Sequence, residues 1–558
     1  MDARLRRRRP LWAWLGLSLL ATAGGPWAVN SGWGQGAPDR PLFDPPAAPA
    51  AAPGGPSLDD RPLATVVADL AGECPPTKST PEQDDQDKAA EKKKQLAAAV
   101  AGAYKPLFYN NDFSYLKDPA YDGWHLGEAL KRRTLFGCDW AKYDVGGEYR
   151  LRYHSEHNIR GKPLSGLNDD FLLQRTRLYF NLQTGERIRF YTEWLDASSN
   201  FQRNPPRAIE VNQFDALDLF VDGKLYDGET GDLWIRGGRQ ELLFGNERLV
   251  SPLDWANTRR TFDGAKAFWK GEQWDVDAFW TRPVPFAQHL VDDDFDDSKG
   301  TAEFMGLYST YKGIENHTLD LFFLRSAEYG QFTLNNVLID GFDANLFGLR
   351  WLGKNDRWLA EIEGGYQFGH YSQANQVAGY CTVGLGRILQ TEGWKPTLWA
   401  YYDWASGDAD PGVGNYGTFN QYFPLAHKYF GFMDIFGRQN IQDINFTYTL
   451  TPHEKVTVLA WYHVLYLAEA RDAVYDVGGN PIYQDPTGSS GNYLGQEIDL
   501  LVTWVMNPRM IAVLGYSHFF TGSYFRSPVI EDGPAGLATN GSNGQQADFV
   551  YLQWSLRF

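Results

Sequence analysis

The chain has 558 residues, a net charge of −17 and an aromatic content of 15%, with 20 Trp and 30 Tyr. The acidic balance argues against a nucleic-acid partner. No run of about 18 or more apolar residues follows the first thirty, which argues against a helical membrane protein. Modest hydrophobicity with many aromatic side chains instead suits a membrane barrel, which has a polar interior and aromatic girdles at both interfaces.

The N-terminus is typical of a secretory signal. Arg4 and residues 6–9 form a basic region, residues 11–20 an apolar run, and Ala21-Thr22-Ala23 a small-residue cleavage site. An uncleaved anchor is the alternative, and the shortness of the apolar run argues against it. We expect a signal peptide over residues 1–23 and a mature protein outside the cytoplasm.

Two segments precede the main domain. Residues 24–80 are rich in Pro, Ala and Gly, which is a linker composition that cannot bury a core. Residues 81–141 are expected to form a helical periplasmic extension. Its helix, a short periplasmic helix or a coiled-coil stub, is expected over residues 81–103, because acidic residues come early, Lys92-Lys93-Lys94 follow and an Ala-rich run comes next. The charged run is interpreted as a solvated face, and a periplasmic partner of this helix is left open.

No resident metal, cofactor or catalytic group is predicted. Cys74, Cys138 and Cys381 are an odd count without a CxxC motif, so at most one disulfide is open to them. On a strand His154 and His157 would face opposite ways, which favours surface histidines over metal ligands. The acidic runs at 292–297 and 408–410 have oxygens that could bind Ca²⁺, but solvated loops are the favoured interpretation.

Strict alternation of apolar and polar residues begins near residue 142 and persists to the end. In the last segment Val550, Leu552, Trp554, Leu556 and Phe558 share one face, and Tyr551, Gln553, Ser555 and Arg557 share the other. A barrel wall needs this pattern, because one face meets lipid and the other meets water. The terminal Phe558 is typical of the signal by which the barrel-assembly machinery recognises outer-membrane proteins.

About eighteen such segments follow one another, each near the ten residues that a tilted membrane strand needs. We therefore predict an all-β fold, a transmembrane antiparallel β-barrel of about 18 strands over residues 142–558. The connections alternate as well. Short turns are expected at residues 184–186, 270–272, 312–316, 353–356, 451–453 and 507–508. Long polar loops are expected at 155–169, 198–213, 283–300, 326–342, 405–439, 468–492 and 521–545.

This alternation of loop length is the outer-membrane arrangement, with short periplasmic turns and long outer loops. A soluble β-sandwich has no reason to show it. An even number of strands places both termini in the periplasm. We expect a bacterial outer-membrane protein surrounded by lipid.

Polar faces opposite the apolar ones are expected to line a lumen. The basic candidates, on early strands, are Arg150, Arg152, Arg175, Arg177, Arg187, Arg189, Arg236 and Arg239. The acidic candidates, on later strands, are Asp275, Asp277, Glu361, Glu363, Asp443, Glu497 and Asp499. We call the basic candidates the basic arc and the acidic candidates the acidic arc. The two arcs could form a charge gradient across the lumen that orients polar solutes and selects ions. Alternatively, these charges pair with one another and rigidify the wall.

Three segments resemble the alginate export family of outer-membrane proteins. The first is residues 236–264, RGGRQELLFGNERLVSPLDWANTRRTFDG. The second runs from DWASGDADP at 403–411 through TFN at 418–420, Phe423-Pro424 and His427 to GRQN at 437–440. The third is GQEIDL at 495–500 with GYSHFF at 515–520, a pattern that many porin strands share. The resemblance covers about residues 143–558.

The resemblance implies a monomeric barrel of eighteen strands and, from the founding activity of the family, export of the anionic polysaccharide alginate through a constriction lined by Arg and Lys. It also implies that a group of arginines lies near the pore or near a loop folded into it. The segment 405–439 is the candidate for partial occlusion. The acidic arc departs from the family pattern because it would repel a polyuronate. The arginines that the resemblance places near the pore are Arg236, Arg239, Arg248, Arg259 and Arg260.

The sequence therefore predicts a passive outer-membrane channel for anionic or polar polysaccharides or small polar solutes. A general or substrate-specific uptake porin is one alternative. A structural or adhesive barrel plugged by its own loops is another. An enzyme is not expected, because no Ser, His and Asp or Asn occur together at a recognisable catalytic spacing.

Overall fold

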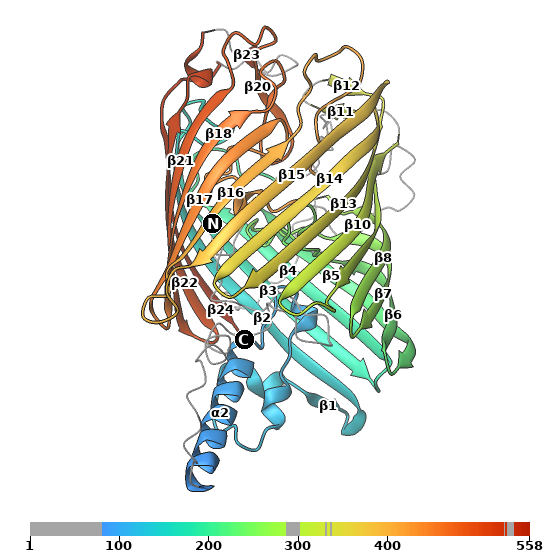
Figure 1. Ribbon diagram of the computed structural model, residues 1–558. Coiled ribbons are helices and arrows are strands. Elements are labelled where there is room, and N and C mark those ends of the chain that lie inside the picture. Colours follow the sequence, from blue (N-terminus) through green and yellow to red (C-terminus); the bar gives the residue numbers. More distant parts are fainter. Residues whose placement is uncertain (1–80, 286–301, 330–331, 335–336, 529–530, 533–540) are drawn as a thin grey trace, which may run out of the picture.

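The computed structural model describes residues 81–285, 302–329, 332–334, 337–528, 531–532 and 541–558 (Figure 1). The expected signal peptide at 1–23, the linker at 24–80, Cys74 and the acidic run at 292–297 lie outside the described residues. Within these ranges, no helix combines the length and the apolar character needed to cross a bilayer.

The wall is one closed antiparallel sheet of 18 strands, as predicted. Each strand pairs with its neighbours in the chain, and the first strand also pairs with the last, from Glu148 opposite Arg557 to His157 opposite Asp548. A single chain therefore closes the barrel. The strands of the wall are β2 (Cys138–His157), β3 (Asp169–Thr184), β4 (Ile188–Asn200), β5 (Asn212–Gly228), β6 (Gly231–Gln240), β7 (Phe262–Gly271), β8 (Trp274–Pro283), β9 (Ala302–Tyr311), β10 (His317–Glu328), β13 (Phe342–Asn355), β14 (Trp358–Tyr371), β15 (Ala374–Ile388), β16 (Thr397–Ala405), β17 (Ile441–His453), β18 (Val456–Leu467), β21 (Tyr493–Asn507), β22 (Met510–Thr521) and β24 (Ala547–Arg557).

Alternation along each strand separates an apolar outer face from a buried inner face. On β24 the side chain of Leu552 is 54% exposed, whereas its neighbours Tyr551 and Gln553 are buried. The same division holds on β14, where Tyr366 is exposed and Gln367 is buried. The outer faces carry the large apolar side chains that a lipid-facing wall requires.

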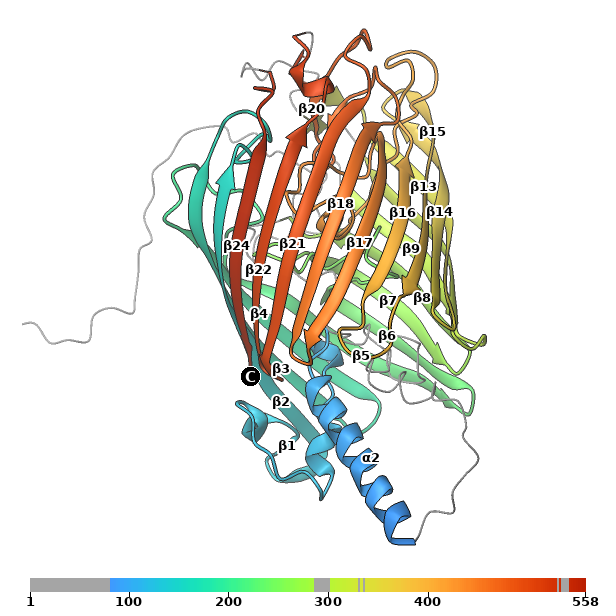
Figure 2. The same cartoon turned by 60° about the vertical axis from the view of Figure 1, so that its left-hand side comes forward.

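Shorter elements lie at the two ends of the barrel. We call the end that holds α2 and the C-terminus the α2 end, and the opposite end, where the long connections gather, the loop end (Figures 1 and 2). The shorter strands are β1 (Arg133–Leu135), β11 (Phe332–Leu334), β12 (Val337–Ile339), β19 (Val474–Tyr475), β20 (Pro481–Gln484) and β23 (Glu531–Asp532). The helix is α2 (Pro81–Ala101), and the 3₁₀ turns are η2 (Phe108–Asn110), η3 (Ser114–Lys117), η4 (Glu128–Leu130), η6 (Ala426–Lys428) and η7 (Tyr524–Arg526).

The connections follow the expected alternation with two differences. The chain between β6 and β7, residues 241–261, forms a further long loop, which is not among the long loops expected from the sequence. At the loop end, β14 and β15 are joined by the short turn at 372–373. The helix expected over residues 81–103 is α2, which ends at Ala101, and the rest of the extension forms irregular segments with short 3₁₀ turns.

Candidate functional site: the barrel interior

Two long loops fold into the barrel and pack against each other. They are the β6–β7 loop (residues 241–261) and the β16–β17 loop (residues 406–440). Backbone N–H groups of Ser251 and Phe423 donate to the carbonyls of Phe423 and Leu249, both at 2.9 Å. The rings of Trp255 and His427 stack with their centres 4.4 Å apart. Together the loops bury a single apolar and aromatic cluster with the inner faces of the wall.

Arginines of β2 hold the backbone of the β6–β7 loop. Arg150 donates to the carbonyls of Asp254 and Ala256 at 2.8 and 3.1 Å. Arg152 donates to the carbonyl of Trp255 at 2.8 Å, and its guanidinium lies 3.8 Å from the centre of the Trp255 ring. Carbonyl groups of a loop without regular secondary structure need such donors when they are buried.

Arginines of β3 are paired with carboxylates that the sequence analysis did not single out. Arg175 lies 2.7 Å from Glu148 on β2 and 2.9 Å from Asp254 in the β6–β7 loop. Arg177 pairs with Glu193 on β4. All five side chains lie in the barrel interior, where a buried charge requires a partner of opposite sign.

The arginines of β4 and β6 share acidic partners. Arg189 and Arg236 both bind Asp222 on β5, the second through its Nε atom at 2.7 Å. Arg239 forms a two-bond contact with Asp263 on β7, with both distances 3.0 Å. The basic-arc arginines of β3, β4 and β6 that lie in the interior are therefore paired with carboxylates on neighbouring strands, whereas those of β2 bind loop carbonyls.

Two residues lie elsewhere than the sequence predicted. Arg187 was placed on the inner face of a strand, but it lies in the exposed turn before β4, whose first residue is Ile188. His154 was interpreted as a surface histidine, but it is buried in the interior, 3.3 Å from Glu156 and stacked on Trp255. His157 is exposed, and the two histidines face opposite ways on β2, both as expected.

The acidic arc on β14 is neutralised by arginines. Arg248 of the β6–β7 loop reaches across the lumen to Glu361 and Glu363, at 3.3 and 3.5 Å. Arg350 on β13 lies 2.7 Å from Asp320 and 3.8 Å from Glu361. One loop is thus bound by the basic arc through its carbonyls and by the acidic arc through its arginine.

The carboxylates of β17 and β21 bind a histidine and the second loop. Asp443 lies 2.7 Å from Nδ1 of His463, whose Nε2 lies 3.6 Å from Asp499. Glu497 accepts a hydrogen bond from the backbone N–H of Met433, in the β16–β17 loop, at 2.9 Å. This part of the wall therefore presents acceptors, and the loop supplies donors to them.

The remaining acidic candidates, on β8, pair with lysines. Asp275 lies 3.0 Å from Lys312, and Asp277 lies 3.0 Å from Lys266 on β7. Every strand residue of both arcs therefore has an ion-pair or hydrogen-bond partner. The arcs bind partners from adjacent strands and from the inward loops. Among the described residues no ion pair joins the two arcs, so the expected pairing of these charges with one another is not found.

The segment that follows α2 enters the barrel from the α2 end. We call residues 103–116 the plug segment. Its aromatic side chains are buried in one cluster with inner-face residues of β3, β4 and β5. Phe108 lies edge-on to Tyr179, with ring centres 5.8 Å apart, and Tyr109 lies edge-on to Phe220 at 5.1 Å. The sequence analysis missed this cluster, although the aromatic residues between 104 and 115 could have indicated a buried segment.

The plug segment also contacts the basic arc and the β6–β7 loop. The guanidinium of Arg177 lies 3.9 Å from the centre of the Phe108 ring, a cation–π arrangement. Arg189 donates to the carbonyl of Tyr109 at 2.7 Å. The Tyr109 hydroxyl donates to the carbonyl of Glu241, at 3.0 Å. The plug segment and the loop thus contact neighbouring arginines of the basic arc from opposite ends of the lumen, and Arg177 lies against both, 3.9 Å from Asp254 of the loop.

Lys131 joins the extension to the end of the last strand. Its ammonium donates to the carbonyls of Val145 and Phe558, at 2.5 and 3.2 Å, and to the hydroxyl of Tyr179 at 3.0 Å. Burial lowers the pKa of Lys131 to about 7. The backbone of Phe558 exchanges two hydrogen bonds with Gly147, so the C-terminal residue lies at the seam of the barrel.

The described residues contain no group of three or more His, Cys, Asp or Glu side chains arranged to hold a metal ion. In the acidic loop segment, Asp408 is buried and Asp410 pairs with Arg471 at 2.8 Å. Cys138 and Cys381 are both free thiols.

A closed antiparallel barrel with an apolar outer face and a charged interior is the architecture of an outer-membrane channel of the porin type. The profile of the alginate export family matches residues 141–535. The chain belongs to the alginate export family, so the resemblance of the three sequence segments is confirmed. Family and fold are those of a transport channel of the bacterial outer membrane and not those of an enzyme class. No curated protein matches the chain.

Solved outer-membrane proteins match at low identity. OprD from Pseudomonas aeruginosa is 10% identical with a TM-score of 0.44, and the match covers 74% of this chain and 94% of that chain. OpdQ from the same organism is 11% identical with a TM-score of 0.46, covering 75% and 97%. OccAB1 from Acinetobacter baumannii is 10% identical with a TM-score of 0.48, covering 75% and 97%.

The shared carboxylate of Asp222 makes the internal pairing testable. Asp222→Ala leaves Arg189 and Arg236 in the interior without their acidic partner, and we expect the free energy of unfolding to fall by about 3–5 kcal/mol. Unfolding by denaturant in lipid vesicles measures it. Asp227→Ala, at the exposed end of the same strand, is the control and should change stability by less than about 1 kcal/mol. Equal stability of the two variants would contradict the pairing.

The lowered pKa of Lys131 predicts how docking of the extension depends on pH. Between pH 7 and about 10.4, an undocked lysine keeps a proton that the docked one releases, so docking becomes more favourable as pH rises, by up to about 1.4 kcal/mol per pH unit. We expect proteolysis of residues 103–131 to be several-fold slower at pH 9 than at pH 7, relative to a free peptide of that sequence. In Lys131→Met the proteolysis rates at pH 7 and pH 9, each relative to the free peptide, should be equal. A wild-type rate that does not change, or that increases with pH, would show that Lys131 does not control docking.

Proposed function

We propose that this chain is a gated outer-membrane channel through which polar or anionic saccharides and small polar solutes diffuse. In this proposal the α2 end faces the periplasm and the loop end faces outward, so both ends of the mature chain are periplasmic. Membership of the alginate export family and the barrel closed by a single chain support the channel. The barrel-assembly machinery would recognise the strand that ends in Phe558.

The observation that carries the proposal is the way in which the plug segment is held. The backbone pairs of the wall run through β2 to β24 and do not include residues 103–116. The plug segment is held instead by side-chain hydrogen bonds and ring contacts with the interior. It can therefore leave the lumen while every strand pair of the wall remains intact.

Release of the plug segment would uncover part of the basic arc. Arg177 and Arg189 would lose their contacts with Phe108 and Tyr109 and face the α2 end. They would keep their carboxylate partners, so the uncovered surface offers many hydrogen bonds and little excess charge. Such a surface favours polar chains, with or without a modest negative charge.

The packing of the interior also supports a second candidate, a structural or adhesive barrel plugged by its own loops. Both inward loops are buried. The β6–β7 loop is bound to opposite walls of the lumen through Arg152 and Arg248, and the β16–β17 loop is bound to the wall through Met433 and Glu497. An uptake porin and an export channel differ only in the direction of net flow, which the concentration gradient sets for passive diffusion. Both are versions of the proposed channel. A permeation experiment separates both channels from the structural barrel.

We expect the double variant Phe108→Ser with Tyr109→Ser to raise the permeation of small neutral sugars into proteoliposomes several-fold, because it removes the aromatic anchors of the plug segment. Trp124→Ser, an exposed aromatic in the same extension, is the matched control and should leave permeation unchanged. If the double variant stays closed, and a variant that also lacks residues 406–440 stays closed, the structural barrel is the correct function.

A further inference from the structure

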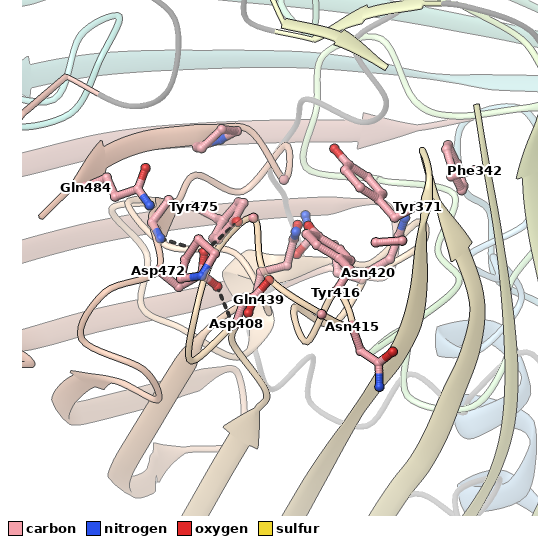
Figure 3. A pocket seen from close by; sticks show the side chains of 18 of the residues that line it. Phe342, Tyr371, Asp408, Asn415, Tyr416, Asn420, Gln439, Asp472, Tyr475 and Gln484 are labelled. Atoms are coloured by element: carbon pink, nitrogen blue, oxygen red, sulfur yellow. Dashed lines mark hydrogen bonds between the residues drawn. The ribbon is translucent and has the colours of Figure 1, made fainter. Parts of the chain in front are cut away.

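A cavity of about 560 Å³ lies at the loop end, within the size range of small-molecule sites (Figure 3). It is formed by the β16–β17 loop, the loop between β18 and β21 (residues 468–492), and the ends of β10, β13, β14 and β15. In Figure 3, Tyr371 lies on one side of the cavity, and Asp472 and Tyr475 lie on the other. A molecule in this cavity would lie at the outer end of the proposed channel.

Several uncharged polar groups of the residues that line the cavity make no hydrogen bond within the described part of the chain. They include the hydroxyl of Tyr371, the side-chain amides of Gln439 and of the exposed Asn415, and the Nδ2 group of Asn420. Amides and phenols each offer donors as well as acceptors. This combination complements the hydroxyl groups of a sugar, each of which both donates and accepts.

The described residues that line the cavity include no Lys, Arg or His. Two carboxylates, Asp408 and Asp472, lie in the wall, so an anion would be repelled there. The Asp472 oxygens accept hydrogen bonds from the backbone of Asp408 and Ala473 and from the hydroxyls of Thr418 and Tyr475. With both oxygens occupied in this way, and with burial raising its pKa to about 6, Asp472 is poorly suited to bind a cation.

Aromatic side chains supply the apolar part of the wall. Tyr371 and Tyr416 stack with ring centres 4.1 Å apart and an interplanar angle of 10°. The loop is fixed there by its backbone, because the N–H of Tyr416 donates to Asn375 at 2.8 Å and the carbonyl of Tyr416 accepts from Val377 at 3.0 Å. The cavity is therefore held open by folded structure, as expected of a site that is formed before its ligand arrives.

We propose that this cavity binds a neutral saccharide, and that the cargo of the channel is a neutral saccharide chain and not a polyuronate. The proposal rests on the channel function given above. The uncommitted amides and phenol select for hydroxyl groups, the tyrosines contact the apolar faces of the sugar rings, and the two carboxylates disfavour acidic sugars. No residue of the basic arc lies among the described residues that line the cavity, so the arc does not offset the two carboxylates there.

Isothermal titration calorimetry tests the site. The full chain in detergent is titrated with neutral tetrasaccharides of glucose, mannose and galactose, and with a tetraguluronate. We expect at least one neutral tetrasaccharide to bind and the uronate to bind at least tenfold more weakly. Tyr371→Phe and Gln439→Leu should each weaken neutral binding by about tenfold, since each removes hydrogen bonds to the ligand. Tyr366→Phe, on the outer face of the same strand, should bind like the wild type.

The uronate binding as tightly as the neutral sugars would overturn the proposal, and so would the failure of the whole neutral panel to bind. Unchanged binding in Tyr371→Phe and Gln439→Leu would place the sugar elsewhere and overturn it too. These outcomes are separate from those of the permeation experiment. If the plug variant opens but no saccharide binds, the cavity proposal fails and the channel stands; if the plug and loop variants stay closed, the channel fails whatever binds.

Discussion

The structure depends on the need of each charged side chain inside the barrel for a partner. Removing a charge from water costs several kcal/mol unless an opposite charge and hydrogen bonds replace the water. Neighbouring strands supply part of this compensation, as Glu193 does for Arg177. The two inward loops supply much of the rest, through carbonyls that Arg150 and Arg152 bind and through the N–H group that binds Glu497. The same pairing that makes the arginines tolerable thus determines where the loops lie.

This arrangement links closure of the lumen to its chemistry. The plug segment contacts arginines of the basic arc from the α2 end, and the β6–β7 loop binds that arc from the loop end. Because the arginines keep their carboxylates, removal of the plug segment uncovers a polar surface with little net charge. The neutral lining of the cavity at the loop end agrees with such a surface. Both features favour polar cargo over a strongly anionic polymer, although the chain belongs to a family named for alginate export.

Much of the wall could be predicted from the sequence, because a lipid-facing strand must alternate and eighteen alternating segments leave little freedom of topology. The pairing of β24 with β2 followed from closure. The interior was harder. Apolar residues such as Leu242 and Leu249 give no signal that separates an inward loop from a strand, since burial favours the same residue types in both. The partners Glu148 and Asp222 occupy the same inner faces as the arginines, but only the register of the strands shows which charges meet. Arg187 was misplaced because alternation continues through a tight turn, and the aromatic residues after α2 could have indicated a packed segment.

The central claim is that the plug segment closes an otherwise intact barrel, and one recording tests it directly. A protease site inserted between Tyr121 and Asp122, in the partly exposed stretch after the plug segment, allows the extension to be cut while the barrel stays in a planar bilayer. We expect low conductance before cleavage and a lasting increase afterwards, in the same channel, with no increase in a chain that lacks the site. Conductance that is already high before the cut, or that stays low after the extension has been washed away, would contradict it.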